Sequence, residues 1–313
     1  MENKKEILGM PVIVFLIVSA VLVIGIVIGS FMDLQISQKL SNLTDPGDFF
    51  QKYGNILSHC MYPVGGICIF KGIKKKNKGY STLAWGILIF TIFWTFYSFL
   101  DVSGEYLRAA YGYKAGDENT LFTLLLTFLS WVALASIVAF IANKLIGDAR
   151  PEALIAAGSV IILGGMFGEY VNEWLKAVGC RPRYKYLITL DDPAKEFKNW
   201  WEMMPYLKDE SSFRSWPSGH MTKATVMFTL PMLAGIVKPE KKGLKYFMFA
   251  IAVAWVCIFG YNRIHMNAHF LTDVCFGVLI TYCIYALIYK CAFSAVSIME
   301  INNKAKNKNG RRK

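Results

Sequence analysis

The segment MPVIVFLIVSAVLVIGIVIGSFM, residues 10–32, contains no charged side chain in 23 consecutive positions. A helix of about 20 mostly apolar residues is long enough to cross the hydrocarbon core of a bilayer. The segment is also too long for the apolar part of a cleaved signal peptide. We therefore interpret it as a retained signal anchor and expect the rest of the chain to belong to a membrane protein.

Apolar segments of similar length recur along the whole chain. Of its 313 residues, 55% are hydrophobic and only 18% are charged, whereas about 25% of the residues of a soluble domain are charged. This composition excludes a disordered chain and a soluble nucleic-acid binder. It predicts an all-α polytopic membrane protein, a helical bundle of about eight transmembrane helices. The expected spans are residues 10–32, 53–72, 81–101, 120–145, 152–175, 220–237, 243–262 and 269–293.

The distribution of Lys and Arg predicts the topology. Short loops rich in these residues stay in the cytoplasm. If the amino terminus is cytoplasmic, the segments expected inside hold 20 of the 34 Lys and Arg residues, so eight spans with both termini in the cytoplasm fit. We expect residues 1–300 to form one membrane domain and residues 301–313 to form a basic, disordered cytoplasmic tail. Solvation or contact with anionic lipid explains that tail better than nucleic acid does.

Residues 176–219 depart from this trend, because they hold eight basic residues on the side expected outside. Three polar clusters lie on that side: KAVGCRPR (residues 176–183), PSGH (residues 217–220), and Arg263 with His269 and Asp273. Each cluster also has an ordinary structural explanation. The basic residues of 176–183 could extend to the lipid headgroups, and PSGH could be a turn with a helix cap. His269 could be a buried histidine that hydrogen-bonds to Asp273. Ionisable residues in membrane segments are functional by default, and three clusters on one face favour a site for an anionic substrate.

These residue types suit phosphoryl transfer. A phosphate monoester has three equatorial oxygens whose charge must be neutralised in the transition state. Arg183 and Arg263 can each bind phosphate through two N–H groups, and Lys176 adds a point charge. Ser218 and Gly219 are expected to begin a helix, where a hydroxyl and backbone N–H groups can hold another oxygen.

Two histidines can divide the chemistry between them. His269 and Asp273 are four positions apart, so on a helix they share a face and can hydrogen-bond. We expect His269, oriented by Asp273, to attack phosphorus and form a phosphohistidine. His220 then protonates the leaving alkoxide and later activates water. Because this face has no acidic cluster suited to Mg²⁺ and the cations already meet the phosphate charge, we expect no metal and no cofactor.

The three clusters resemble the tripartite signature of the type 2 phosphatidic acid phosphatase superfamily: K-x6-R-P, then P-S-G-H, then S-R-x5-H-x3-D. The resemblance covers residues 176–273 and implies the same roles for the same residues. More loosely, DLQIS (residues 33–37) resembles the usual link between the first two helices of the family. Two positions depart from the signature. Tyr184 replaces Pro, which we expect to leave the aim of Arg183 less fixed, and Asn262 replaces Ser but can still donate a hydrogen bond.

The resemblance also implies a fold and a function. The usual core has six helices, so we expect an inserted hairpin, formed by the third and fourth spans. The implied activity is hydrolysis of a lipid phosphate or diphosphate at the extracytoplasmic face. In a chain that resembles bacterial ones, such a site suggests a polyprenyl diphosphate, such as undecaprenyl diphosphate, or a phosphatidic acid-like lipid.

Two features favour a lipid substrate. The site lies at the ends of spans, at headgroup depth, and the loop 184–216 places aromatic residues beside lysines, as is typical of a membrane interface. A loop packed on the outer surface of the protein itself explains the same composition. A non-catalytic lipid or anion transporter would need only the charges, and a related phosphotransferase would pass the phosphoryl group to another acceptor. The sequence leaves the oligomeric state open.

Overall fold

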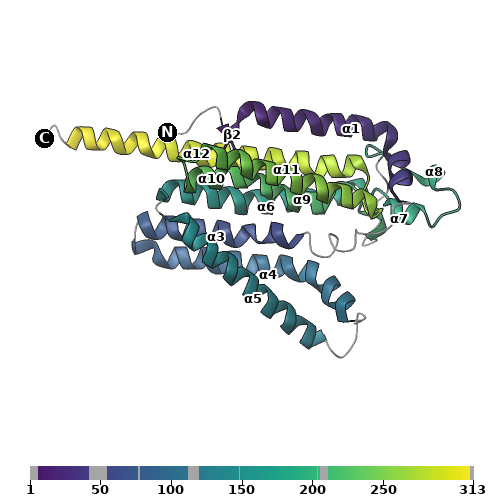
Figure 1. Cartoon of the computed structure of the whole chain (residues 1–313), viewed down its shortest axis with the longest axis horizontal. Helices are drawn as coiled ribbons and strands as arrows, with labels where there is room; N and C mark the ends of the chain where they lie inside the picture. The colour runs from purple at the N-terminus through teal and green to yellow at the C-terminus, as the bar shows by residue number, and fades with distance from the viewer. Residues whose placement is uncertain are drawn as a thin grey trace.

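Long helices dominate the computed structural model, which describes residues 6–41, 55–76, 78–111, 120–147, 149–202, 204 and 211–310. This confirms the all-α prediction (Figure 1). The elements are β1 (Glu6–Ile7), β2 (Met10–Pro11), α1 (Val12–Ser41), α3 (Met61–Lys76), η1 (Lys78–Tyr80), α4 (Ser81–Tyr111), α5 (Thr120–Ile146), α6 (Pro151–Gly179), α7 (Tyr184–Leu187), α8 (Pro193–Glu196), η2 (Ser211–Phe213), α9 (Gly219–Ala224), η3 (Thr225–Thr229), α10 (Leu230–Val237), α11 (Lys242–His265) and α12 (Leu271–Gly310). β1 and β2 pair as a short antiparallel ladder.

Six helices of the described chain are long and apolar enough to cross a membrane: Val12–Ser41, Asn55–Lys76, Phe128–Ile146, Pro151–Leu187, Lys242–His265 and Leu271–Ser297. The other two expected spans are also helical. α4 (Ser81–Tyr111) contains the whole segment expected at 81–101, and the segment expected at 220–237 is divided among α9, η3 and α10. About eight helical segments are therefore present, as the composition predicted. The expected start of the second span, at residue 53, lies outside the described residues.

Two helices run further than expected. α1 continues to Ser41, so residues 33–37 lie inside this helix and do not form a link after it. α12 continues to Gly310, through most of the tail that we expected to be disordered. In both cases the helix continues beyond the apolar run through a more polar segment. These segments contain Lys, Gln or Ala, which have good helix propensity.

The helix expected at 220–237 is interrupted by its own sequence. Pro231 cannot donate a backbone hydrogen bond, so it occupies the first turn of α10. The hydroxyls of Thr225 and Thr229 donate to the carbonyls of Met221 and Val226, at 2.7 Å each. Such side-chain bonds compete with the regular helical ladder. The result is the 3-10 segment η3, which separates α9 from α10.

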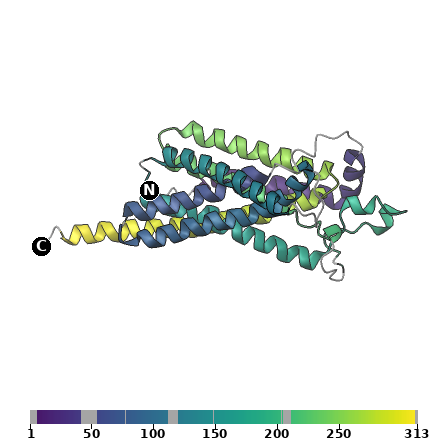
Figure 2. The same cartoon turned by 90° about the horizontal axis from the view of Figure 1, so that it is seen from below.

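α6 and α12 lie at the centre of the bundle. α6 packs against α3 and α12, and α12 also contacts α1 and α9. α3 and α6 approach closely because both have glycines at the contact, and a Cβ at Gly158 would overlap the carbonyl of Gly65. α4 and α5 pack against α3 and against each other on one side of the bundle, as an added hairpin would (Figures 1 and 2).

The two ends of the bundle differ. Figure 1 shows both ends of the described chain at one end of the bundle, and α7 and α8 at the other. The three motifs lie toward the α7 and α8 end, where α6 finishes and where α9 and α12 begin. All seven cysteines are free.

Candidate active site

The first motif straddles the C-terminal end of α6. The helix ends at Gly179, and Cys180 adopts a left-handed conformation (φ 42°, ψ 37°) while its N–H donates to the carbonyl of Lys176. This geometry turns the chain out of the helix. Lys176 therefore stays on the last turn of α6, and Arg183 lies in the following connection, where its backbone N–H donates to Ser212 at 2.7 Å.

The second motif is held against the third by the backbone. The N–H of Ser218 donates to the carbonyl of Asp273 at 3.0 Å, and α9 begins at Gly219 as predicted. A Cβ added at Gly219 would lie 2.7 Å from Nζ of Lys176 and 3.2 Å from Oδ1 of Asn172. Glycine at this position thus lets α9 approach the Lys176 ammonium.

Ser218 does not cap α9 with its side chain, although its position suggested a cap. Its hydroxyl oxygen is buried and has no hydrogen-bond partner among the described residues. Buried polar atoms usually have a partner. A phosphate oxygen at this point would supply one, which agrees with the role expected for Ser218.

His269 lies in the connection between α11 and α12 and is buried. Its Nδ1 is 2.7 Å from the carbonyl oxygen of Ser215. A carbonyl oxygen only accepts hydrogen bonds, so Nδ1 carries the proton and Nε2 keeps a free lone pair. The ring of His220 lies 6.4 Å from that of His269, between centroids, and packs edge-on against Phe259. The two predicted catalytic histidines are therefore neighbours.

Asp273 does not bind His269 in the way that the spacing suggested. The distance from Nδ1 of His269 to Oδ2 of Asp273 is 4.0 Å, which is too long for a hydrogen bond. α12 begins at Leu271, so His269 lies before the helix and the four-residue spacing does not place both side chains on one helical face. Asp273 instead accepts hydrogen bonds from the Ser215 hydroxyl at 2.6 Å and from the Phe270 N–H at 2.9 Å. Its influence on His269 passes through these two neighbours.

Arg181 is a buried residue of the site that the motif analysis missed. Its guanidinium donates to Oδ1 of Asp273 at 2.6 Å, to Oδ2 of Asp33 at 3.0 Å and to the hydroxyl of Thr272 at 2.8 Å. Its Nε donates to the carbonyl of Lys198 at 2.8 Å. Asp33, in α1, also accepts the N–H of Thr272 at 3.1 Å. An aspartate directly after the apolar run of the first helix was the sequence signal for a cation nearby.

Arg263 is also buried, in the last turn of α11. Its guanidinium donates to Oδ1 of Asn262 at 2.5 Å and lies over the ring of Phe259 at 5.4 Å. Asn262 therefore acts on this arginine as an acceptor, whereas we expected it to contribute a donor. The carbonyl of Arg263 accepts the N–H of His269 at 3.2 Å, which ties the two residues of the third motif together.

Tyr184, which replaces the proline of the signature, is buried and begins α7. Its ring packs against Phe270, with 6.1 Å between centroids. The next backbone N–H, of Lys185, donates to the carbonyl of Asn267 at 2.8 Å. The segment that follows Arg183 is thus held by packing and hydrogen bonds.

Two further charged residues border the site. Glu173 accepts a 2.8 Å hydrogen bond from Lys176 and forms an ion pair with Arg214. Glu173 precedes Lys176 by one helical turn, a spacing that favours such pairs, and Arg214 belongs to the basic segment before PSGH. A phosphate that binds Lys176 must therefore compete with the Glu173 carboxylate.

The charges around His269 set its protonation state. Burial, together with the positive charges of Arg183, Lys176 and Arg263, lowers the pKa of His269 well below its ordinary value of 6.5. All three predicted phosphate-binding cations therefore act on the same imidazole. At neutral pH the imidazole is uncharged, which is the form that attacks phosphorus.

The aromatic residues of the 184–216 loop mostly face the protein. Phe197 packs against Phe270 with 5.3 Å between ring centroids, and Trp200 packs against Phe276 at 4.6 Å. Only Trp201, half exposed, faces outward among these described aromatics. Residues 203 and 205–210 of this loop lie outside the described residues. For Phe197 and Trp200, packing on the protein surface is the better explanation of the aromatic composition.

Comparison with known proteins agrees with this geometry. A family model described as the PAP2 superfamily matches residues 124–297, more than half of the chain, and includes all three motifs. No curated protein and no solved structure matches the chain significantly. Among the described residues, no three His, Cys, Asp or Glu side chains are grouped so that they could hold a metal ion. The chain belongs to the PAP2 superfamily, whose members are phosphatases, and its helices make it a multi-pass membrane protein.

Proposed function

We propose that this protein hydrolyses a lipid phosphate or diphosphate through a phosphohistidine formed on His269. The observation that carries the proposal is the hydrogen bond between Nδ1 of His269 and the carbonyl of Ser215. It directs the free lone pair of Nε2 away from that carbonyl, in an imidazole that is neutral and lies beside three cations. A nucleophile oriented in this way is what covalent phosphoryl transfer requires.

Substrate binding uses the cations and the buried hydroxyl. Lys176, Arg183 and Arg263 neutralise the phosphate oxygens, and Ser218 donates its hydroxyl proton to one of them. Gly219 keeps α9 close enough for this, because a side chain there would displace the Lys176 ammonium. The phosphate also releases Lys176 from Glu173, which remains paired with Arg214.

The chemistry proceeds in two displacements. Nε2 of His269 forms a bond to phosphorus, the bond to the leaving oxygen breaks, and its electron pair goes to that oxygen. The leaving oxygen takes a proton from the imidazolium form of His220, which the negative charge of the bound phosphate stabilises. In the second step His220 removes a proton from water, and the water oxygen attacks the phosphohistidine. The P–N bond breaks, its electrons return to Nε2, and inorganic phosphate leaves.

Asp273 and Arg181 act as positioning residues. Arg181 fixes Asp273, Asp273 fixes the hydroxyl of Ser215, and the carbonyl of Ser215 fixes the imidazole of His269. As positive charge develops on the imidazole during attack, the nearby Asp273 carboxylate stabilises it without a direct hydrogen bond. No metal ion is needed for any of these steps, because the protein itself supplies the cations.

The proposed orientation places both termini in the cytoplasm and the site at the extracytoplasmic face. Its support is the excess of Lys and Arg in the segments at the end of the bundle opposite the motifs. We expect a site at the ends of α6 and α11, two helices long enough to span a bilayer, to lie at headgroup depth, where a lipid phosphate is presented. A polyprenyl diphosphate and a phosphatidic acid-like lipid both fit this position.

The adjacent histidines favour catalysis over transport. A lipid or anion transporter would use the cations but has no need for an oriented imidazole beside a second one. A phosphotransferase would use the same residues with an alcohol in place of water. The same site geometry would serve hydrolysis and phosphoryl transfer. The two reactions differ only in whether water or an alcohol accepts the phosphoryl group.

The decisive experiment measures phosphate release from a panel of lipid phosphates and diphosphates by purified protein without added metal. We expect turnover by the wild type, none by His269→Ala and unchanged turnover by Lys195→Ala, a matched change at an exposed loop residue. When the phosphate of the substrate is radiolabelled and the reaction is quenched under alkaline conditions, the wild-type protein should carry the label on His269 and on no other histidine. Equal turnover by His269→Ala would refute the mechanism, and transport without phosphate release would favour the transporter.

A further inference from the structure

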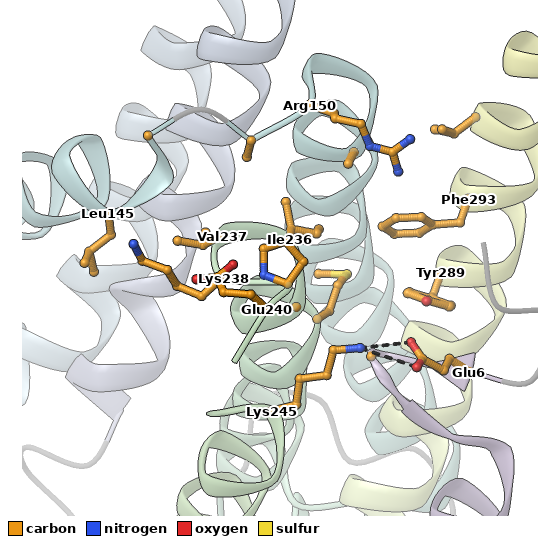
Figure 3. A pocket seen from close by; sticks show the side chains of 18 of the residues that line it. Glu6, Leu145, Arg150, Ile236, Val237, Lys238, Glu240, Lys245, Tyr289 and Phe293 are labelled. Carbon is orange, nitrogen blue, oxygen red and sulfur yellow. Dashed lines mark hydrogen bonds and ion pairs between the residues drawn. The ribbon is translucent and has the colours of Figure 1, made fainter. Parts of the chain in front are cut away.

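A cavity with polar and apolar walls (Figure 3) lies at the end of the bundle opposite the motifs. Its volume is about 750 Å³, within the range of about 300–1,000 Å³ that is typical of small-molecule sites. It is lined by the C-terminal part of α5, the residues that begin α6 and α11, the end of α10 and one face of α12. Arg150 lines it just before α6, and Lys176 lies in the last turn of the same helix. At about 1.5 Å per residue, α6 separates the two by about 39 Å, so this cavity is not part of the catalytic site.

Cations outnumber acids in the lining. Among the described residues of the lining, four are basic and two are acidic: Lys144, Arg150, Lys238, Lys245, Glu6 and Glu240. Glu6 is already neutralised, because Lys245 lies 3.3 Å from its carboxylate, as Figure 3 shows. In the described part of the chain, Lys144 and Lys238 form no ion pair with a carboxylate, and Lys144 lies over the ring of Phe140. The described residues that line the cavity therefore carry a net positive charge at neutral pH.

The remaining lining is apolar. Leu145, Ile236 and Phe293 border the same space as Arg150 and Lys238 (Figure 3). A purely ionic ligand would gain nothing from these side chains. A ligand with an anionic group and a hydrocarbon part would contact both kinds of wall.

We propose that this cavity binds the phosphate group of an anionic phospholipid, with Lys144, Arg150 and Lys238 around the phosphate. Basic pockets between transmembrane helices suit anionic headgroups, and the apolar wall formed by Leu145, Ile236 and Phe293 accepts the start of an acyl chain. The essential chemistry is recognition of a phosphate anion, which free inorganic phosphate shares. The apolar wall is the reason to favour the lipid as its source.

Phosphatidylglycerol is the appropriate probe. Its phosphate is a diester, so it does not present the phosphomonoester dianion for which the catalytic site is suited. Purified protein is incubated with phosphatidylglycerol or phosphatidylcholine micelles, and the retained lipid is counted by native mass spectrometry. We expect the wild type to retain phosphatidylglycerol in preference to phosphatidylcholine, and His269→Ala to retain it equally. The result is therefore independent of the proposed catalytic function.

Paired variants test the cations. Lys144→Gln/Lys238→Gln should bind phosphatidylglycerol about 30-fold more weakly, from about 1 kcal/mol for each lost cation. The matched control, Lys74→Gln/Lys242→Gln, removes the same charge at the same end from exposed lysines that do not line the cavity, and should bind like the wild type. Lys144→Arg/Lys238→Arg should also retain the lipid, which separates lost charge from lost folding.

Competition identifies the source of the phosphate. Displacement of the lipid only by other anionic phospholipids supports the lipid site, whereas binding of inorganic phosphate alone, weakened by the glutamine pair, would assign the same site to free phosphate. Equal retention by the wild type and by Lys144→Gln/Lys238→Gln would overturn the proposal. So would equal retention of phosphatidylcholine and phosphatidylglycerol by the wild type, together with no binding of inorganic phosphate.

Discussion

Replacing Arg181 with Met tests how the site is held together. Met has a similar length but no charge, and it would leave the carboxylates of Asp33 and Asp273 buried without the guanidinium that binds both. Removing one partner of a buried ion pair typically costs about 3–5 kcal/mol of unfolding free energy. We expect a loss of this size, because both carboxylates are almost completely buried (1% and 0% exposed side chains).

The same change should affect turnover more than substrate binding. Among the described residues, Arg181 donates hydrogen bonds to Asp33, Asp273, Thr272 and the carbonyl of Lys198, which are all protein groups. Its loss disturbs Asp273 and hence the support of His269. A displacement of about 1 Å at a reacting group can lower the rate about 100-fold, so we expect kcat to fall by about this factor and KM to change little.

The measurements are detergent-solubilised unfolding curves and steady-state kinetics on the same preparations. Lys195→Met, at an exposed loop position, serves as the control for the chemical change. Adding Asp33→Asn to Arg181→Met removes one of the two stranded carboxylates and should recover about 0.5–3 kcal/mol. The reasoning fails if Arg181→Met unfolds within about 1 kcal/mol of the wild type, or if KM rises while kcat is unchanged.

Two further predictions concern the catalytic site itself. Gly219→Ala should raise KM with a smaller effect on kcat, because the new Cβ would lie 2.7 Å from the Lys176 ammonium. The matched control is Gly243→Ala, where the added Cβ meets nothing within 4 Å. An unchanged KM for the lipid phosphate in Gly219→Ala would contradict this prediction. The pH profile of kcat/KM should retain activity as the pH falls through 6.5, since the pKa of His269 is well below that value and protonation, which removes the nucleophile, occurs only at lower pH. The substrate phosphate itself titrates near pH 6, so its protonation is measured separately; an enzyme limb at 6.5 after that correction would contradict the lowered pKa of His269.

The positions of the catalytic motifs could be predicted because their chemistry is visible locally. A phosphate substrate must be bound by cations. In a membrane protein few ionisable residues lie at the ends of the spans, so the candidate cations can be identified from the sequence. Lys176, Arg183, Arg263 and the two histidines could therefore be proposed as site residues before their geometry was known. The charges of all three cations do act on His269, which is what a common site requires.

The details of contact could not be predicted in the same way. The proposed bond between His269 and Asp273 assumed that both residues lie on one helix, but α12 begins two residues after His269. A shift of this size at a helix end is invisible in an apolar pattern and yet decides which atom a side chain reaches. The Ser215 carbonyl, which takes the place of Asp273, offers no sequence signal because every residue has one.

The Arg181–Asp33 pair shows why long-range contacts matter most in the first helix. α1 is apolar on nearly all sides, and lipid solvates its faces almost equally well, so the hydrophobic effect does not choose which face meets the bundle. Its buried residues form one narrow stripe, Ile26, Gly29, Asp33 and Ser37. Only Asp33 in that stripe carries a charge, and a buried charge is tolerated only when it is paired. The ion pair with Arg181, 148 positions away in sequence, therefore fixes the rotation of α1 and its position against the start of α12. Through this pair, a helix outside the region matched by the family model helps to hold Asp273 in the candidate active site.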